Sequence, residues 1–297
     1  MYTSFSGENQ ILSFLSVSSS NLLSALCTDQ AVDYGLLKNG NGGTQCIPRF
    51  RYGLDNQRID NITDWGLKQF QLHYQSSPHP EVPASSRASK GEGGARGGPS
   101  RPRLRQGYGA APQGEGLLND AITKDDIFHY VYGVLHDPVY REKYTINLKR
   151  EFPRIPFYPD FKAWADWGKR LMDLHIGYET VQPWPLERID IPVGTTVNKA
   201  ILKADKDNGS IRLDGVTTLT GVPKSAWEYR LGNRSGLEWI LDQYKEKKPR
   251  DPTIAAKFNT YRFADYKEKV VDLLSRVTRV SVETMEIVDA MKKAERE

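Results

Sequence analysis

Several patterns that would assign a function directly are missing from this chain of 297 residues. Cysteine is scarce: Cys27 and Cys46 are the only ones, so we expect a reduced protein without a disulfide framework. No apolar run approaches the ~18 residues that a membrane-spanning helix needs. The opening residues, MYTSFSGENQ, lack the basic start and apolar stretch of a signal peptide. These absences lead us to expect a cytoplasmic protein.

Motifs of common enzymes are missing as well. The chain has no GxxxxGK[ST] loop to cradle phosphates and no Asn-Pro-Pro-aromatic loop of an amino-group methyltransferase. Its two cysteines stand alone and no two histidines are four residues apart, so no zinc site is predicted. His129, His136 and His175 lie on predicted helices without a catalytic partner pattern, which favours a packing role. We therefore predict no catalytic residue, metal or cofactor for this chain.

Charge and composition divide the chain unevenly. The net charge is only +4, so an anionic partner has to be met by a local basic patch. Residues 76–116 are rich in Gly, Pro, Ser and Arg and almost lack aliphatic side chains. Such a segment buries too little apolar surface to offset its ordering entropy, so we predict a disordered insert. It is either a plain flexible insert or an electrostatic tether to nucleic acid.

The stretch at 122–178 predicts three successive helices. Thr123 and Asp126 have the spacing of a capping box, which satisfies free amides of a first helical turn. Asp137-Pro138 combines an acidic N-cap with proline at the first helical position. A proline-bounded extended link follows, and Asp160 then caps the third helix. Together these segments predict a compact helical block with one apolar side.

Shorter elements are predicted on both sides of that block. A strand ending near Pro48 belongs at a sheet edge, because proline cannot donate to a neighbouring strand. Residues 61–75 predict a helix with Trp65, Phe70 and Tyr74 pointing inward. Short strands are expected at Val197–Leu202, Ile211–Leu213 and Val216–Leu219, a helix from a capping box at Ser235 and Glu238, and long terminal helices from Val270 onward.

The predicted fold is α+β and mostly helical. It has a helical block, a small antiparallel β portion in the N-terminal part and a β-hairpin near 197–219. We divide the chain into a β-rich N-terminal part at 1–75, the insert at 76–116 and a helical remainder at 117–297.

Basic side chains on helix faces and in loops are the remaining chemical signal. Lysine and arginine neutralise phosphates, arginine can pair with guanine and asparagine with adenine. The loop at 230–234 can enter a groove, or its side chains can satisfy neighbouring backbone and carboxylates. The candidate DNA contacts are Arg49, Arg51, Arg141, Lys143, Lys149, Arg150, Arg154, Lys169, Arg170, Arg230, Asn233 and Arg234.

Four segments resemble the C-terminal specificity domain of Type ISP restriction–modification enzymes. They are NITDWGLKQFQLHYQ at 61–75, and the stretches at 122–157, 168–179 and 219–244. In that family one polypeptide joins a nuclease, a helicase-like ATPase, an adenine-N6 methyltransferase and this target recognition domain. The resemblance implies sequence-specific binding of double-stranded DNA, with the other parts of the system as partners. S-adenosylmethionine, ATP and magnesium are implied only for those other parts.

Two departures from the family pattern shape the expectation. Residues 76–116 look like an insertion, and the upstream catalytic motifs are missing, so we expect a detached recognition domain or a fragment of a larger gene. The loop at 230–234 belongs to a family-wide motif, which suits phosphate clamping better than base reading. Two alternatives stay open: a protein-interaction scaffold or decayed remnant without DNA affinity, and a free-standing enzyme.

Overall fold

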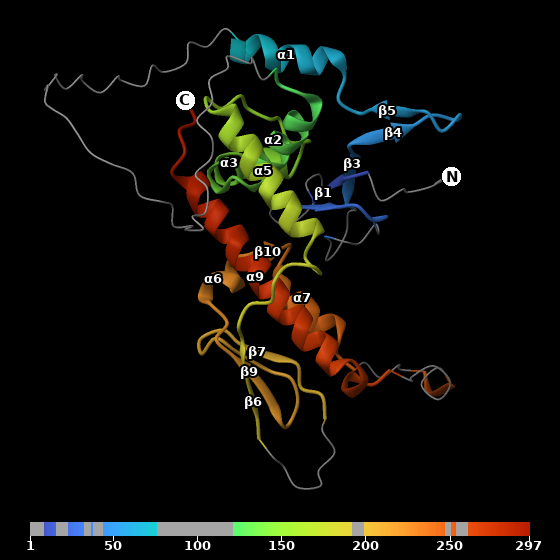
Figure 1. The fold of residues 1–297 in the computed structure, drawn as a ribbon, viewed down its shortest axis with the longest axis vertical. Helices are drawn as coiled ribbons and strands as arrows, with labels where there is room; N and C mark the ends of the chain where they lie inside the picture. The colour runs from blue at the N-terminus through green and yellow to red at the C-terminus, as the bar shows by residue number, and fades with distance from the viewer. Residues whose placement is uncertain are drawn as a thin grey trace, which may run out of the picture.

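The computed structural model describes residues 9–15, 23–32, 37, 44–75, 121–191, 199–246, 251–253 and 261–297. The predicted insert at 76–116 lies outside these residues. Within them, the chain is a mostly helical α+β fold with small antiparallel sheets, as predicted. Figure 1 shows a helical upper part, a small sheet at the lower end, and one long helix that runs from the upper part down to the level of the sheet.

The N-terminal part forms a three-stranded antiparallel sheet with the order β2-β1-β3. Its strands are β1 (Ile11–Leu15), β2 (Ser24–Thr28) and β3 (Gln45–Pro48). Strand β3 lies at the edge, which confirms the position predicted from Pro48. Strand β1 is buried along its whole length, and its Leu12 and Phe14 enter the first hydrophobic core. Two further strands, β4 (Phe50–Tyr52) and β5 (Arg58–Asp60), pair as a separate hairpin.

Five helices build the helical block, one more than predicted, because the helix expected after Asp137-Pro138 divides in two at Tyr144. They are α1 (Asp64–Gln75), α2 (Lys124–His136), α3 (Pro138–Lys143), α4 (Thr145–Leu148) and α5 (Phe161–Ile176). The predicted caps are confirmed. Thr123 and Asp126 form the capping box of α2, and the Asp137 carboxylate accepts a hydrogen bond from the amide of Val139 at 3.0 Å. Asp160 accepts from the amide of Ala163 at the start of α5.

The extended link between α4 and α5 is held by tyrosine hydroxyls. The hydroxyl of Tyr140 donates to the carbonyl of Arg154, and that of Tyr130 donates to the carbonyl of Pro156. The Tyr130 oxygen also accepts from the amide of Tyr158, whose carbonyl accepts from the hydroxyl of Tyr74 at 2.7 Å. Because prolines prevent this link from forming a helix, its polar groups need such partners when they are buried.

Helices α2 and α5 approach each other at two glycines. A Cβ added to Gly168 of α5 would lie 1.8 Å from the carbonyl oxygen of His129 in α2, and one added to Gly133 would lie 2.5 Å from that of Trp164. The two helices can approach this closely only because neither of these two positions carries a side chain. The glycine pair therefore sets the spacing of the two central helices.

The C-terminal part carries a four-stranded antiparallel sheet of order β6-β9-β8-β7. Its strands are β6 (Glu187–Asp190), β7 (Lys203–Asp205), β8 (Ser210–Arg212) and β9 (Thr217–Thr220). It is followed by α6 (Lys224–Glu228), the short pair β10 (Arg230–Leu231) and β11 (Arg234–Ser235), and α7 (Gly236–Gln243). The predicted capping box of Ser235 and Glu238 is confirmed at the start of α7.

Two predictions about this region need correction. The sequence predicts a strand at Val197–Leu202, but residues 199–202 are not a strand, and 192–198 lie outside the described residues. Leu202 has a φ of 46°, which turns the chain just before β7 begins. The hairpin is also part of a larger sheet, because β6 adds a strand beside β9. All four residues of β6 are exposed, so the sequence gives no apolar alternation there.

One long helix replaces the terminal helices predicted from Val270 onward. After a 3₁₀ turn, η1 (Phe263–Tyr266), helix α9 (Lys267–Lys292) continues for 26 residues, or about 39 Å. Its Val270 and Leu274 belong to the core around the C-terminal sheet, and its Ile287 and Met291 to the core of the helical block. Of the helices in the described residues, none combines the length and the apolar character of a membrane span.

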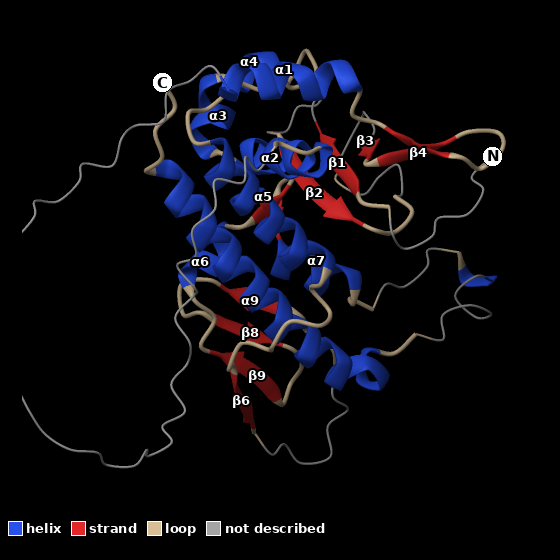
Figure 2. Cartoon of the chain, turned by 45° about the horizontal axis from the view of Figure 1, so that its top comes forward, coloured by secondary structure: helices blue, strands red, loops and turns tan. Residues whose placement is uncertain are grey.

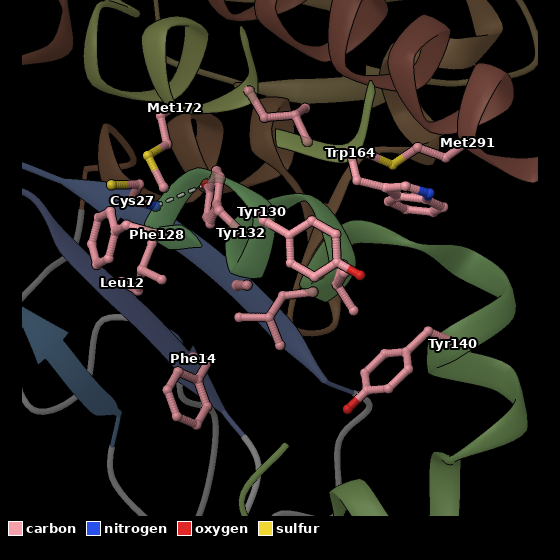
Figure 3. Packing of buried hydrophobic residues seen from close by; sticks show 14 of the residues in the cluster. Leu12, Phe14, Cys27, Phe128, Tyr130, Tyr132, Tyr140, Trp164, Met172 and Met291 are labelled. Atoms are coloured by element: carbon pink, nitrogen blue, oxygen red, sulfur yellow. Dashed lines mark hydrogen bonds between the residues drawn. The ribbon is translucent and has the colours of Figure 1, made fainter. Parts of the chain in front are cut away.

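A chain of buried hydrogen bonds crosses the first core. The amide of Cys27 donates to the hydroxyl oxygen of Tyr132 at 2.9 Å, drawn as a dashed line in Figure 3. The same hydroxyl lies 2.6 Å from Nδ1 of His175, whose Nε2 lies 3.0 Å from the hydroxyl of Thr284. Burial lowers the pKa of His175 to about 3, so its ring is neutral and both nitrogens have partners. The packing role predicted for the helix histidines is confirmed at this position.

Trp65 corrects the prediction for α1. Phe70 and Tyr74 pack against the rings of Phe157 and Phe161, but Trp65 is 73% exposed. Trp65 lies in the first turn of α1, beyond the part of the helix that faces the block.

The glycine contact yields a stability prediction. Gly168→Ala raises helix propensity by about 1 kcal/mol, but its methyl group meets a backbone carbonyl that cannot move alone. We expect a net loss of about 2 kcal/mol in the free energy of unfolding, measured by urea denaturation. Gly215→Ala is the matched control, since nothing lies within 4 Å of its Cβ position. Equal effects of the two substitutions would contradict the close packing.

Candidate nucleic-acid interface

Arg49 lies between the N-terminal strands and the first turn of α2. Its side chain is 7% exposed, with Nη1 at 2.5 Å from the carboxylate of Asp60 and Nε at 2.6 Å from that of Asp125. The hydrogen bond from Arg49 holds the pKa of Asp60 below its usual value. Lys124 extends the group, with its Nζ at 2.6 Å from Asp64. Arg49 therefore links β5 to the first turn of α2. Its contact with a DNA phosphate stays a prediction.

Arg141 turns inward from α3. Its Nε donates to the carbonyl of Leu135 at 2.5 Å, and the side chain lies near the rings of Tyr132 and Tyr229. Burial lowers the pKa of Arg141 to about 10, still far above neutrality. The guanidinium is therefore a partly buried cation held against the end of α2, in a poor position for meeting a phosphate.

The predicted loop at 230–234 is a tight turn between β10 and β11. A guanidinium nitrogen of Arg230 donates to the carbonyl of Asn233, and Arg234 pairs with Asp242 at 2.9 Å. The guanidinium of Arg234 also lies over the ring of Trp239. The amide of Gly232 donates to the hydroxyl of Ser24 in β2. Both cations of the loop are thus engaged, Arg230 within the turn and Arg234 with α7.

The other predicted cations lie toward solvent. Three of them form exposed ion pairs: Lys143 with Glu297 at 3.9 Å, Arg154 with Glu151 at 2.9 Å and Lys169 with Asp173 at 2.8 Å. Exposed pairs of this kind contribute only about 0–1 kcal/mol, so a phosphate can replace the carboxylate at little cost. Arg51, Lys149, Arg150 and Arg170 have no ion pair with any described residue.

A cavity of about 440 Å³ lies beside one of these cations, Arg154, along α3, α4 and the extended link. Its wall includes the aromatic rings of Tyr140, Tyr144 and Phe152, with Glu151 and Arg154 among the lining residues. Phe152 and Tyr144 are also partly exposed to solvent. An aromatic wall next to the guanidinium of Arg154 suits a planar or extended polar partner.

Arg58, in the β4–β5 hairpin, is a further exposed basic residue, which the sequence analysis did not select. It lies on β5, directly opposite Tyr52, and its guanidinium stacks on the ring of Phe50 at 4.4 Å. The signal in the sequence was the Gly53–Asn56 turn, which places basic strands on both sides. Within the described residues, no group of three or more His, Cys, Asp or Glu side chains lies close enough to hold a metal.

Comparison with known proteins relates this geometry to one family. The model of the Type ISP C-terminal specificity domain matches residues 1–273. The chain is a Type ISP C-terminal specificity domain. This confirms the resemblance seen in the sequence. Among curated proteins, no sequence matches this chain.

Solved structures similar to this specificity domain are large enzymes. A cryo-EM structure of a DrdV–DNA complex is 44% identical, with a TM-score of 0.78 over 98% of this chain and 25% of that one. A nuclease-deletion mutant of the Type ISP enzyme LlaGI, in complex with a DNA substrate mimic, is 23% identical, with a TM-score of 0.63 over 97% of this chain and 21% of that one. The ATP-dependent Type ISP enzyme LlaBIII bound to DNA is 21% identical at the same TM-score, over 97% and 16%. The likeness to LlaGI and LlaBIII shows the fold alone. This chain spans a quarter or less of the length of each of the three matched chains.

The ion pairs of the buried Arg49 predict a stability defect. Arg49→Ala removes two charge-assisted hydrogen bonds to Asp60 and Asp125, so we expect the free energy of unfolding to fall by about 2 kcal/mol. Arg51→Ala removes an exposed side chain and should change it by less than about 0.5 kcal/mol. Urea denaturation of both variants measures the difference. A loss no larger for Arg49 than for Arg51 would remove the structural role.

Proposed function

We propose that this specificity domain binds double-stranded DNA and recognises a short sequence for a Type ISP restriction–modification enzyme. The observation that carries the proposal is the 44% identity to the DrdV–DNA complex over 98% of this chain. The exposed cations described above, such as Arg150 and Arg170, supply the phosphate contacts that fix a protein on the duplex. Nuclease, ATPase and methyltransferase parts are its partners in the cytoplasm, and they hold ATP, magnesium and S-adenosylmethionine.

The division of labour follows from the chemistry of the chain. A recognition domain has to present cations and hydrogen-bonding side chains in a fixed arrangement, and it needs no nucleophile or metal. Buried titratable groups such as His175 and Cys27 are used in packing. Burial raises the pKa of Cys27 to about 12, which leaves its thiol protonated and unreactive.

A second role is favoured by the exposed apolar side chains of α1. Trp65 is 73% exposed and Leu72 is 52% exposed. Such side chains are enriched where one protein surface meets another. A contact surface for the other parts of the enzyme is compatible with DNA recognition. The alternative is a scaffold without DNA affinity, and DNA-binding measurements distinguish the two.

The salt dependence of binding tests the DNA role. We expect the 297-residue chain to bind a random-sequence duplex, with log K falling linearly as log salt rises. Changing Arg150→Ala together with Arg154→Ala should weaken binding to every duplex. It should also flatten the slope by about 2, since each lost phosphate contact removes about 0.9. Fluorescence anisotropy over a salt series measures both quantities.

The matched control has the same change in charge. Lys245→Ala with Lys292→Ala removes two cations that form exposed pairs with Asp242 and Asp289, and it should keep the original slope. If the arginine variant keeps the slope as well, these arginines are not at the interface. If the unchanged chain fails to bind duplex even at low salt, the scaffold role replaces DNA recognition.

A further inference from the structure

The hairpin of β4 and β5 stands away from the rest of the molecule. It forms its own two-stranded sheet, with Phe50 opposite Asp60 and Tyr52 opposite Arg58. Figures 1 and 2 both show it projecting sideways from the body, far from the C-terminal sheet. None of its described residues belongs to either hydrophobic core cluster. Apart from Asp60 at its base, which pairs with Arg49, the hairpin has little to contribute to the stability of the fold.

The tip of the hairpin is nevertheless well formed. The amide of Gly53 donates to the carbonyl of Gln57 at 2.9 Å, and the amide of Asn56 donates to the carbonyl of Gly53 at 3.0 Å. The Asp55 carboxylate folds back to accept from the amide of Gln57. Asn56 adopts a φ of 60°, a conformation that asparagine tolerates better than most residues. A Cβ at Gly53 would lie 2.6 Å from the Asp55 carboxylate, so a larger residue there would displace the Asp55 side chain from the turn.

The side chains at this tip point into solvent. Leu54 has a relative exposure of 111%, so no other part of the described chain covers it. Asn56 and Gln57 are exposed as well, and their side-chain amide groups form no hydrogen bond with the described residues. A single exposed leucine is ordinary, but this one lies beside two side-chain amides without a hydrogen-bond partner, on a preorganised turn. Amides read adenine edges, and apolar side chains contact the methyl group of thymine.

Two arginines lie on opposite faces of the ribbon. In the antiparallel register, Arg51 is opposite Ile59, and Arg58 is opposite Tyr52. Because directly opposed residues share a face and neighbours along a strand alternate, the two arginines point to different sides. Neither forms an ion pair with a carboxylate among the described residues. The ribbon therefore carries one cation without an ion pair on each face and hydrogen-bonding groups at its end.

We propose that the β4–β5 hairpin enters the major groove of DNA tip first. Arg51 and Arg58 then contact phosphates of the two opposite strands, while Leu54, Asn56 and Gln57 meet the base edges. The proposal rests on the proposed DNA-binding function and adds the element that reads sequence. Of these residues, only Arg51 was among the contacts predicted from the sequence.

The dimensions of the ribbon select the major groove. A sheet with side chains on both faces is about 10 Å thick, which fits a groove about 12 Å wide and is excluded from one about 6 Å wide. At about 3.3 Å per residue, the tip extends roughly 7–10 Å beyond the arginines. The major groove is about 8.5 Å deep, so the tip reaches the bases when the arginines are level with the phosphates.

DNA explains these features better than a protein surface does. A protein partner would have to present acidic groups on both sides of a narrow slot to match the flanking arginines. The duplex offers that arrangement at every turn, because its two phosphate backbones border each groove. The one acidic side chain of the tip, Asp55, is held by the turn through its bond to the amide of Gln57.

The experiment selects preferred duplexes from a randomised pool with the 297-residue chain and with two variants. Arg51→Ala with Arg58→Ala should flatten the salt slope by about 2 and weaken binding to all duplexes alike. Leu54→Ala with Gln57→Ala should keep the salt slope and lose at least about fivefold preference at one to three adjacent base pairs. Methylation protection should appear at guanine N7, which lies in the major groove, and not at adenine N3 in the minor groove.

Controls separate the outcomes. Lys245→Ala with Lys292→Ala should select the same duplexes as the unchanged chain, and thermal unfolding should show that all variants are folded. Suppose that the unchanged chain selects a sequence, and that both hairpin variants select the same sequence with the same dependence of log K on log salt. The hairpin proposal is then wrong while the DNA function stands. Protection at adenine N3 alone also overturns it. If the unchanged chain binds no duplex, the proposed function itself fails.

Discussion

The structure depends on the double membership of helix α9. Its first half packs Val270 and Leu274 into the core around the C-terminal sheet, and its second half packs Ile287 and Met291 into the core of the helical block. A helix of 26 residues is stable in water mainly through packing of its apolar face. Each core therefore stabilises the helix against which the other core packs. The two cores thus have one shared structural element.

Polar contacts fix α9 at both ends of this arrangement. Thr284 of α9 bonds the buried His175, and Arg296 just beyond the helix pairs with the fully buried carboxylate of Asp137 at 2.8 Å. In the first half, the carbonyl of Ser275 accepts from the amide of Trp184 in the segment that leads to β6. Buried polar groups of this kind are costly unless all are paired, so they specify one position of the helix. The proposed DNA-contacting residues lie outside these contacts, on a frame that is already fixed.

Local signals in the sequence predicted local structure well. The capping boxes at Thr123 and Ser235, the Asp137-Pro138 start and the edge position of Pro48 depend on a few neighbouring residues, and all are confirmed. Strand β6 was missed because pairing with β9, about 30 residues later, makes it a strand, and its exposed residues carry no pattern.

Long-range pairing also limited the prediction of the interface. Arg49 and Arg51 look alike in sequence, yet Asp60 and Asp125 bury the first and leave the second free. Arg141 was assigned to an outer face, whereas packing of α3 turns it toward the carbonyl of Leu135. The family resemblance gave the function class because it draws on whole segments, but it could not distinguish cations that build the frame from those that face a partner.

Amide hydrogen exchange along α9 tests the shared-helix account most directly. The account predicts that amides in both halves, near Leu274 and near Met291, exchange through the same global opening with the same free energy. Protection of one half that persists while the other half opens on its own would contradict it, because the two cores would then be independent units.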